Sequence, residues 1–185
     1  MIALGSVDGM GMSRMESGCD DSPMYDGEFW SNQDALMQLY DVGMTSMFSM
    51  EAAALAELAD AIGRPEGPLL RRRAGSMAAR ISAHLWDEQG GIFTNKFANG
   101  SFYRRISPTS FYALLANAST DAQAELMMTH WMMNRSRFCV TPRGDMAGND
   151  ADGCYWGLPS ISADDVAFKK KRATLATGAG TFGAP

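Results

Sequence analysis

The chain has no excess of basic residues: its 185 residues include 16 Lys and Arg against 21 Asp and Glu, for a formal net charge of -5. Proteins that bind nucleic acid carry a basic footprint, so this composition argues against a nucleic-acid partner. No apolar run approaches the roughly 20 residues needed to cross a bilayer, and the first residues lack the basic and apolar regions of a signal peptide. We therefore expect a neutral or small partner and no membrane segment in this chain.

Cysteine and histidine are also scarce. The three cysteines are odd in number and share no CxxC spacing, which argues against a disulfide framework and favours reduced thiols; they are Cys19, Cys139 and Cys154. His84 and His130 lie at unrelated spacing on expected helices, with no cysteine at ligand spacing. Residues 149–153 resemble only the first part of a calcium loop, without its remaining ligands. The sequence thus predicts no metal site and no cofactor.

Helical periodicity is the clearest pattern that is present. Between residues 43 and 62 apolar side chains recur every three to four positions, which predicts a helix with these residues facing inward: Met44, Met47, Phe48, Met50, Ala54, Leu55, Leu58 and Ile62. Thr45 or Ser46 is the expected cap, and Gly63 the expected stop. A second helix should open at residues 65–68 and run to about Leu85. The short connection predicts that the two helices pack antiparallel.

Further along the chain, Asn99-Gly100 stands between two strand-like stretches and predicts a small β-hairpin near residues 91–106. Residues 108–116 indicate a short helix, and Ser119 should cap another that runs to about Trp131. Residues 134–162 show no period and are expected to form a long loop. The predicted fold class is therefore all-α, built of antiparallel helix pairs with one small hairpin.

The densest polar feature is an acidic cluster within residues 16–26. Its four carboxylates have only Arg14 as a nearby base: Glu16, Asp20, Asp21 and Asp26. Such a cluster can solvate a loop, hold a cation, or form a site where the protonation of a carboxyl matters. Taken alone, exposed acids of this kind favour the solvated loop.

Three sequence motifs support a resemblance to a known family. Residues 16–26, Glu-Ser-Gly-Cys-Asp-Asp-Ser-Pro-Met-Tyr-Asp, resemble the ESG motif of inverting glycoside hydrolases with an (α/α)6 barrel. The likeness is greatest to the mannosylglycerate-hydrolase-like and processing α-glucosidase group, with trehalases more distant. Residues 85–93, Leu-Trp-Asp-Glu-Gln-Gly-Gly-Ile-Phe, resemble the family's LWDEEDGFF string, and residues 159–168 resemble its P-S-V/I-S-x-D-D-P-A-F string. Because the three motifs follow the family's order and spacing, the resemblance is specific.

The resemblance implies a toroid of about twelve helices, for which this chain is too short at typical helix lengths. We therefore expect an incomplete (α/α)6 toroid over residues 1–168. Residues 169–185 change abruptly to low complexity and should be disordered. The family continues at this point into a YWRG motif, and one choice of codons for residues 175–185 yields that motif in a neighbouring frame. We hypothesise a frameshift or a mispredicted splice between Phe168 and Leu175.

The resemblance also implies catalytic and binding residues. An inverting glycosidase needs a carboxylic acid that protonates the leaving oxygen and a second carboxylate that activates water. Asp20 matches the family's general acid, and burial beside the like-charged Asp21 and Glu16 would raise its pKa so that it keeps a proton. Asp21 is a departure, since the family commonly has Asn or an aromatic residue there. Glu16 and Asp21 are also expected to contact the substrate.

Three further residues are candidates for the sugar pocket: Tyr25, Trp30 and Asp41. Aromatic faces stack on sugar rings, and a carboxylate accepts hydrogen bonds from paired hydroxyls. Asp41 matches an Asp-x-Asn-like turn of the family, whereas for Trp30 alone a packing role is the simpler interpretation.

The family's catalytic base is a Glu downstream of YWRG, which this chain does not reach. The expected function is therefore that of a glycosidase fragment acting on α-linked glucosides or mannosides, inactive on its own. Two alternatives stay open: a non-catalytic carbohydrate-binding remnant, and a helical-repeat interaction scaffold.

Overall fold

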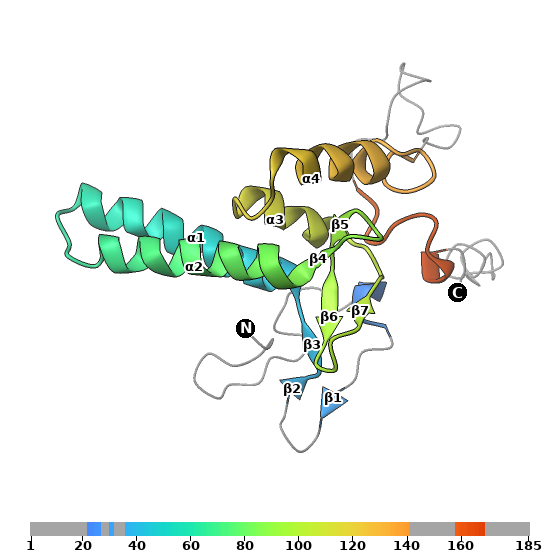
Figure 1. The fold of residues 1–185 in the computed structure, drawn as a ribbon, viewed down its shortest axis with the longest axis horizontal. Helices are drawn as coiled ribbons and strands as arrows, with labels where there is room; N and C mark the ends of the chain where they lie inside the picture. The colour runs from blue at the N-terminus through green and yellow to red at the C-terminus, as the bar shows by residue number, and fades with distance from the viewer. Residues whose placement is uncertain (1–21, 27–29, 32–35, 141–157, 169–185) are drawn as a thin grey trace, which may run out of the picture.

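A computed structural model of the chain describes residues 22–26, 30–31, 36–140 and 158–168, with only the backbone of residues 30, 31 and 36. Helices make up most of this part, and short antiparallel strands lie at one end of the long helix pair (Figure 1). The helix-dominated fold with a small sheet agrees with the expected incomplete toroid. Most of the predicted loop at 134–162 and the whole predicted tail lie outside the described residues.

The long helices are α1 (Val42–Ala61) and α2 (Gly67–Leu85), as the periodicity predicted to within about two residues. The cap of α1 is Asp41, whose side chain accepts the Met44 N–H, so the predicted caps at positions 45 and 46 are wrong. At the other end Gly63 has a φ of 69°. The N–H groups of Gly63 and Arg64 bond back to the carbonyls of residues 60 and 59, which is a Schellman motif.

The predicted inner face of α1 is only partly right, because Met44, Phe48 and Met50 are partly buried against the hydrophobic clusters and the other predicted residues are exposed. Its buried residues are small or polar, and they pack against α2 and α3: Val42, Gly43, Thr45, Ser46, Ser49, Ala52, Ala56 and Ala59. Leu55, Leu58 and Ile62 are instead 51%, 61% and 74% exposed. Periodicity arguments assume that large side chains point inward, but here the helices approach so closely that only small ones fit.

The contact between α1 and α2 shows how close this approach is. A Cβ added at Gly67 would lie 2.1 Å from the Asp60 carboxylate, so only glycine fits this position without movement. The Ser49 hydroxyl donates to the Ala74 carbonyl at 3.0 Å, directly from helix to backbone. Asp60 also pairs with Arg71 at the exposed end of the two helices.

Short strands follow the helix pair. β4 (Trp86–Asp87) pairs with β5 (Ile92–Phe93), and β6 (Asn95–Phe97) pairs with β7 (Phe102–Tyr103) around the Asn99-Gly100 turn, which confirms the predicted hairpin. The hairpin belongs to a three-stranded antiparallel sheet, because β3 (Leu39–Tyr40) pairs with β6. A separate pair joins β1 (Trp30–Ser31) to β2 (Leu36–Met37). Strands β1, β2 and β3 were not predicted. β3 pairs with a strand more than 50 residues away, and β1 and β2 are only two residues long.

The last helices are short. A 3-10 turn, η3 (Pro108–Phe111), leads into α3 (Tyr112–Leu115), and α4 (Asp121–Leu126) continues as the π-helical turn η4 (Met127–Met132). Thr120, not the predicted Ser119, caps α4 through a reciprocal capping box with Gln123. Figure 1 shows α3 and α4 stacked beside the end of the long pair that carries the strands.

Two hydrophobic clusters hold the elements together. The larger joins α2, β5, η3, α3 and η4 through residues such as Ile81, Phe93 and Phe138. The smaller joins the segment before β1 to residue 161 through Met24, Tyr25, Met37, Leu39 and Ile161. Cys139 is buried and disulfide-bonded, so the prediction of a reduced thiol is wrong at this position.

Candidate active site

Asp41 is a fully buried carboxylate at the start of α1. Its Oδ2 accepts hydrogen bonds from the Tyr25 hydroxyl at 2.9 Å and the Asn95 side-chain amide at 3.1 Å, and its Oδ1 accepts the Met44 N–H at 2.8 Å. Burial raises the pKa of Asp41, while these hydrogen bonds act in the opposite direction. The sequence singled out Tyr25 and Asp41 separately, and the structure brings them into direct contact.

Asn95 completes this arrangement and was missed by the sequence reasoning. It is 4% exposed, and its Oδ1 accepts the Val42 N–H at 2.8 Å while its amide donates to Asp41. The first strand of the hairpin is thereby joined to the first turn of α1. A lone Asn in a hairpin gives no sequence signal for this role, because its partners lie more than 50 residues away.

The last part of the ESG-like motif forms a 3-10 turn, η2 (Pro23–Tyr25), capped by Ser22. Its three residues are buried. The Tyr103 hydroxyl donates to the Asp26 carbonyl at 2.7 Å, and Arg105 donates to the carbonyls of Pro23 and Asp26. Residues at the end of the hairpin therefore hold the turn through its backbone.

Residues 161–168, which belong to the third motif, lie beside the turn η2. Ile161 packs against Met24 and Tyr25, the Ser162 N–H donates to the Ile106 carbonyl at 2.9 Å, and Asp165 pairs with Arg105. Residues 22–26, 103–106 and 161–168 thus meet, and we call this place the motif junction. The first and third family-like motifs therefore meet here, beside the β6–β7 hairpin that follows the second motif.

The second motif forms its own polar contact. Asp87 has a side-chain exposure of 3% and pairs with Arg104, whose Nε lies 2.6 Å from Oδ2. The adjacent cavity of about 260 Å³ is lined by both of these residues and by Gln89, Trp131 and Arg137, among others. Its charged groups already have partners, since Arg137 stacks on Trp131 at 3.8 Å and pairs with Asp164. This cavity presents no unpaired charge to a ligand.

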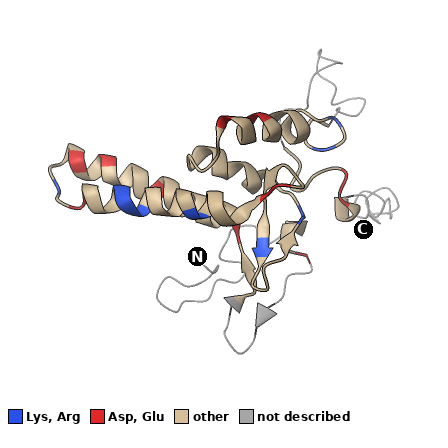
Figure 2. Cartoon of the chain, in the orientation of Figure 1, with Lys and Arg blue, Asp and Glu red and all other residues tan. Residues whose placement is uncertain are grey.

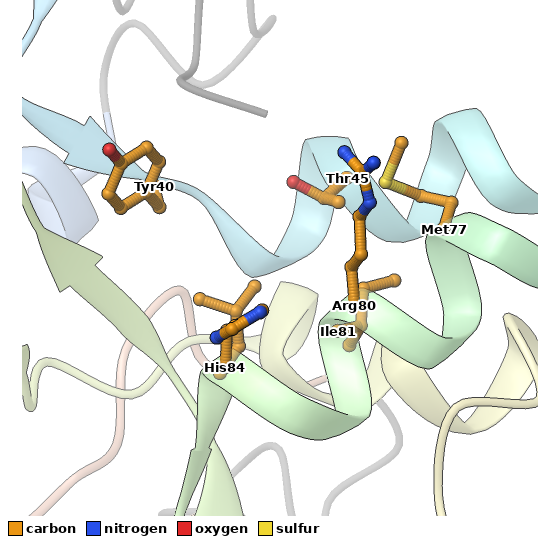
Figure 3. Close-up of a pocket in the computed structure, with 7 residues that line it drawn as sticks. Tyr40, Thr45, Met77, Arg80, Ile81 and His84 are labelled. Carbon is orange, nitrogen blue, oxygen red and sulfur yellow. The ribbon is translucent and has the colours of Figure 1, made fainter. Parts of the chain in front are cut away.

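A smaller hollow lies between β3, the first turn of α1 and the last turns of α2. Figure 3 shows its lining, which includes Tyr40, Thr45, Arg80 and His84. Its volume is about 10 Å³. A cavity of that size has room for about one water and not for a sugar.

Charges are spread thinly over the helices. Figure 2 shows acidic residues on α1 and α4 and basic residues on α2, with both signs near the strands. Within the described ranges, no three His, Cys, Asp or Glu side chains gather in a way that could hold a metal ion. No helix in the described part of the chain combines the length and hydrophobicity that a membrane crossing requires.

Of the predicted site residues, Glu16, Asp20 and Asp21 lie outside the described residues. Trp30 is placed by its backbone alone, which pairs with Met37. Tyr25 and Asp41 are 2% and 0% exposed and bond to each other. The proposed roles of all six residues in catalysis and sugar binding stay predictions.

The fold has known relatives. An uncharacterized conserved protein from Thermus thermophilus superposes with a TM-score of 0.61 and 15% identity, over 82% of this chain and 42% of that chain. Neutral trehalase Nth1 from Saccharomyces cerevisiae gives a TM-score of 0.49 with 18% identity, over 68% of this chain and 22% of that chain. No curated protein matches the sequence. The chain spans less than half the length of each of the two structural relatives.

The long helix pair, the shorter helices and the small sheet define a helix-dominated domain. Residues 7–173 match the mannosylglycerate hydrolase MGH1-like glycoside hydrolase domain. The chain belongs to this family, as the three motifs predicted.

Proposed function

We propose that this chain carries the general-acid part of an inverting glycoside hydrolase that acts on α-linked glucosides or mannosides, such as mannosylglycerate-like, oligosaccharide or trehalose-like substrates. The family match over residues 7–173 carries the proposal. The meeting of the ESG-motif segment with residues 161–168 supports it, because residues far apart in sequence then border one site.

Asp20 is the proposed acid. Inversion requires it to donate a proton to the glycosidic oxygen as the bond to the sugar breaks, while a base on the opposite face takes a proton from the attacking water. The like charges of Glu16 and Asp21 favour the protonated form of Asp20 at neutral pH. Asp21 and Glu16 are also proposed to contact the substrate.

A buried turn follows the proposed acid in sequence. Pro23 follows Asp20 by three residues and starts a buried turn whose Tyr25 is bonded to Asp41. Tyr25, Trp30 and Asp41 are proposed for the sugar-binding side of the site.

The proposed base lies outside this chain. Large apolar side chains on α1 and at its C-cap are left without cover in the described structure, including Leu55, Leu58 and Ile62. An exposed apolar stripe of this kind marks a surface that packs against further protein. Together with the 42% coverage of the Thermus chain, the stripe supports a larger parent toroid to which the base belongs.

The test begins with the nucleotide sequence around codons 168–175. If a neighbouring frame restores YWRG, the polypeptide continued in that frame should hydrolyse α-mannosides or α-glucosides and release the β-anomer first, as ¹H NMR can show. Asp20→Asn should lower the turnover of that polypeptide roughly 100- to 10,000-fold. Asp60→Asn, in an exposed ion pair on the long helices, is the control and should retain most of the activity.

Two outcomes would contradict the proposal. Unchanged turnover in Asp20→Asn would remove the acid from this residue. A continued polypeptide that binds the sugars without hydrolysing them would favour a carbohydrate-binding remnant instead.

A further inference from the structure

We propose that the cavity beside Asp87 and Arg104 is a second binding site, which holds one neutral, hydroxyl-rich ring such as a single sugar residue. The preference for a neutral, hydroxyl-rich group comes from the cavity itself. The choice of a sugar among such groups rests on the proposed function, because saccharides are the ligands that a glycosidase meets. None of the described residues that line the cavity is proposed for hydrolysis.

The cavity has the size of a small ligand. Its volume is about 260 Å³. Pockets for drug-sized molecules begin at roughly 300 Å³, and a single water needs far less space than either. The cavity therefore suits one sugar ring and is too small to enclose an oligosaccharide.

The charged groups around the cavity are paired with one another. Arg104 Nε lies 2.6 Å from Asp87 Oδ2, and Arg137 Nε lies 3.1 Å from Asp164 Oδ2. A carboxylate beside each guanidinium cancels much of its attraction for a further anion. An ionised ligand would give up its hydration for a site that does not balance its charge. The pairing therefore favours a neutral ligand.

The ion pairs use only part of each guanidinium. Arg104 donates through Nε and Nη2 to Asp87 and Gln89, and its Nη1 donates no hydrogen bond within the described residues. Arg137 donates through Nε and Nη1, so its Nη2 likewise has no bond in the described part of the chain. A guanidinium carries five N–H donors in a planar fork. Both arginines thus keep donors for the hydroxyl groups of a ligand.

Apolar side chains complete the lining. Ile92 and Ile106 are 1% and 2% exposed, and Trp131 lines the same cavity. Ligand sites combine apolar surface with a few polar groups that fix the orientation of the ligand. A sugar ring matches such a lining, because C–H groups lie between its hydroxyls.

The donors are held in place before a ligand arrives. Arg137 stacks on Trp131 at 3.8 Å and donates to the His130 carbonyl at 3.0 Å. Trp131 in turn donates from Nε1 to the Gly90 carbonyl at 2.9 Å. Side chains that are already ordered lose little conformational entropy on binding. A small neutral ligand can therefore be bound by few contacts.

The cavity borders the motif junction but uses other side chains. Arg104 and Ile106 line the cavity, whereas Arg105 between them bonds to the carbonyls of residues 23 and 26 and to residue 165. Gln89 and Trp131 contribute to the cavity and belong to no segment of the junction. Binding at the two places can therefore be distinguished residue by residue.

The test is an NMR titration of the 185-residue chain with methyl α-D-mannoside. A Kd on the order of 1 mM is expected for a ligand with so few non-hydrogen atoms. The resonances that shift should be the Trp131 indole N–H, the Gln89 side-chain amide and the backbone amides of Gly90 and Ile92.

Two arginine variants make the test specific. Arg104→Lys keeps a positive charge beside Asp87 but removes the fork of donors, so it should weaken binding by about 10-fold. Arg71→Lys is the matched control, because Arg71 also pairs with an aspartate but lies on the long helices. It should bind the mannoside as the wild type does.

The charge of the ligand gives a second readout. Glucuronate and methyl α-D-glucoside are similar in size, and glucuronate adds a carboxylate. Because the charges around the cavity are paired, glucuronate should bind no more tightly than the glucoside.

Four results would overturn the inference. They are no shift at the cavity resonances at tens of millimolar sugar, shifts confined to residues 22–26, equal weakening in both arginine variants, and tighter binding of glucuronate than of the glucoside. The second would place the sugar at the motif junction, and the fourth would make the cavity an anion site.

The outcome is separable from the proposed function. Binding needs no turnover, so a failed hydrolysis assay would remove the glycosidase proposal and leave a sugar bound in the cavity standing. Conversely, an empty cavity in the titration would remove only the second site.

Discussion

The α1–α2 pair and the motif junction are held together by opposite means. The helices satisfy their own backbone groups and pack through small side chains, and the Asp60–Arg71 pair lies at their exposed end. The junction consists of short segments that side-chain hydrogen bonds join to one another, beside the backbone bond from Ser162 to Ile106. Arg105 supplies two of these bonds to the turn η2, and Asp41 receives three beside it.

This difference indicates where the removal of a side chain should lower the stability most. Loss of one exposed side chain should hardly affect the helix pair, whereas loss of one polar side chain near the junction leaves several buried groups without partners.

The largest effect is expected at Asp41. Asp41→Ala removes the acceptor for the Tyr25 hydroxyl, the Asn95 amide and the Met44 N–H. Leaving these groups unpaired should lower the free energy of unfolding by about 3 kcal/mol or more. Urea denaturation measures this loss. Asp60→Ala on the same helix is the control and should change stability little, because Asp60 is exposed.

The pH dependence of Asp41 gives a second test. Burial raises its pKa above the ordinary 3.8, so the folded state holds this proton more tightly than the unfolded chain does. The stability that Asp41 contributes is therefore fully present below pH 3.8 and is lost as the pH rises through its folded pKa. Asp41→Asn cannot ionise. Its unfolding free energy should increase relative to that of the wild type as the pH rises, and a pH-independent difference between the two proteins would contradict this.

Because small residues are buried on α1 and large ones are exposed, enlarging a small residue should cost more stability than truncating a large one. Ala56 is fully buried, so Ala56→Leu should overpack the contact and cost about 1–3 kcal/mol. Leu58 is 61% exposed, and Leu58→Ala should stay within about 0.5 kcal/mol. Thermal or urea unfolding compares the two variants. An equal loss of stability in both variants would show that the face of α1 with the large apolar side chains is buried in the isolated chain.

The smallest effect concerns the start of α4. Thr120→Ala removes a capping side chain and should cost about 1 kcal/mol. Ser119→Ala next to it should have almost no effect, because Ser119 does not cap the helix. Circular dichroism during urea unfolding can separate the two. A larger loss in Ser119→Ala would move the cap to the position that the sequence suggested.

Helices and the hairpin could be predicted because their signals are local. Gly63 ends α1 where expected, and Asn99-Gly100 turns the hairpin where expected. The buried face of α1 could not be predicted, since it consists of small residues such as Ser49, Ala52 and Ala56 that face another helix.

The site was only partly predictable. Family-like motifs pointed to Tyr25 and Asp41, and the structure places these two in contact. Asn95 and Arg105 carried no signal of their own, because their partners lie 54 and about 80 residues away. A contact between distant polar residues is fixed by the fold and leaves no period in the sequence.

The central claim is that this chain holds one half of a two-carboxylate site. The most direct test incubates the purified 185-residue chain with α-mannosides and α-glucosides and follows sugar release by ¹H NMR. The account predicts no release above the buffer control. Release that Asp20→Asn abolishes would contradict it, because both the acid and the base would then have to lie within these residues.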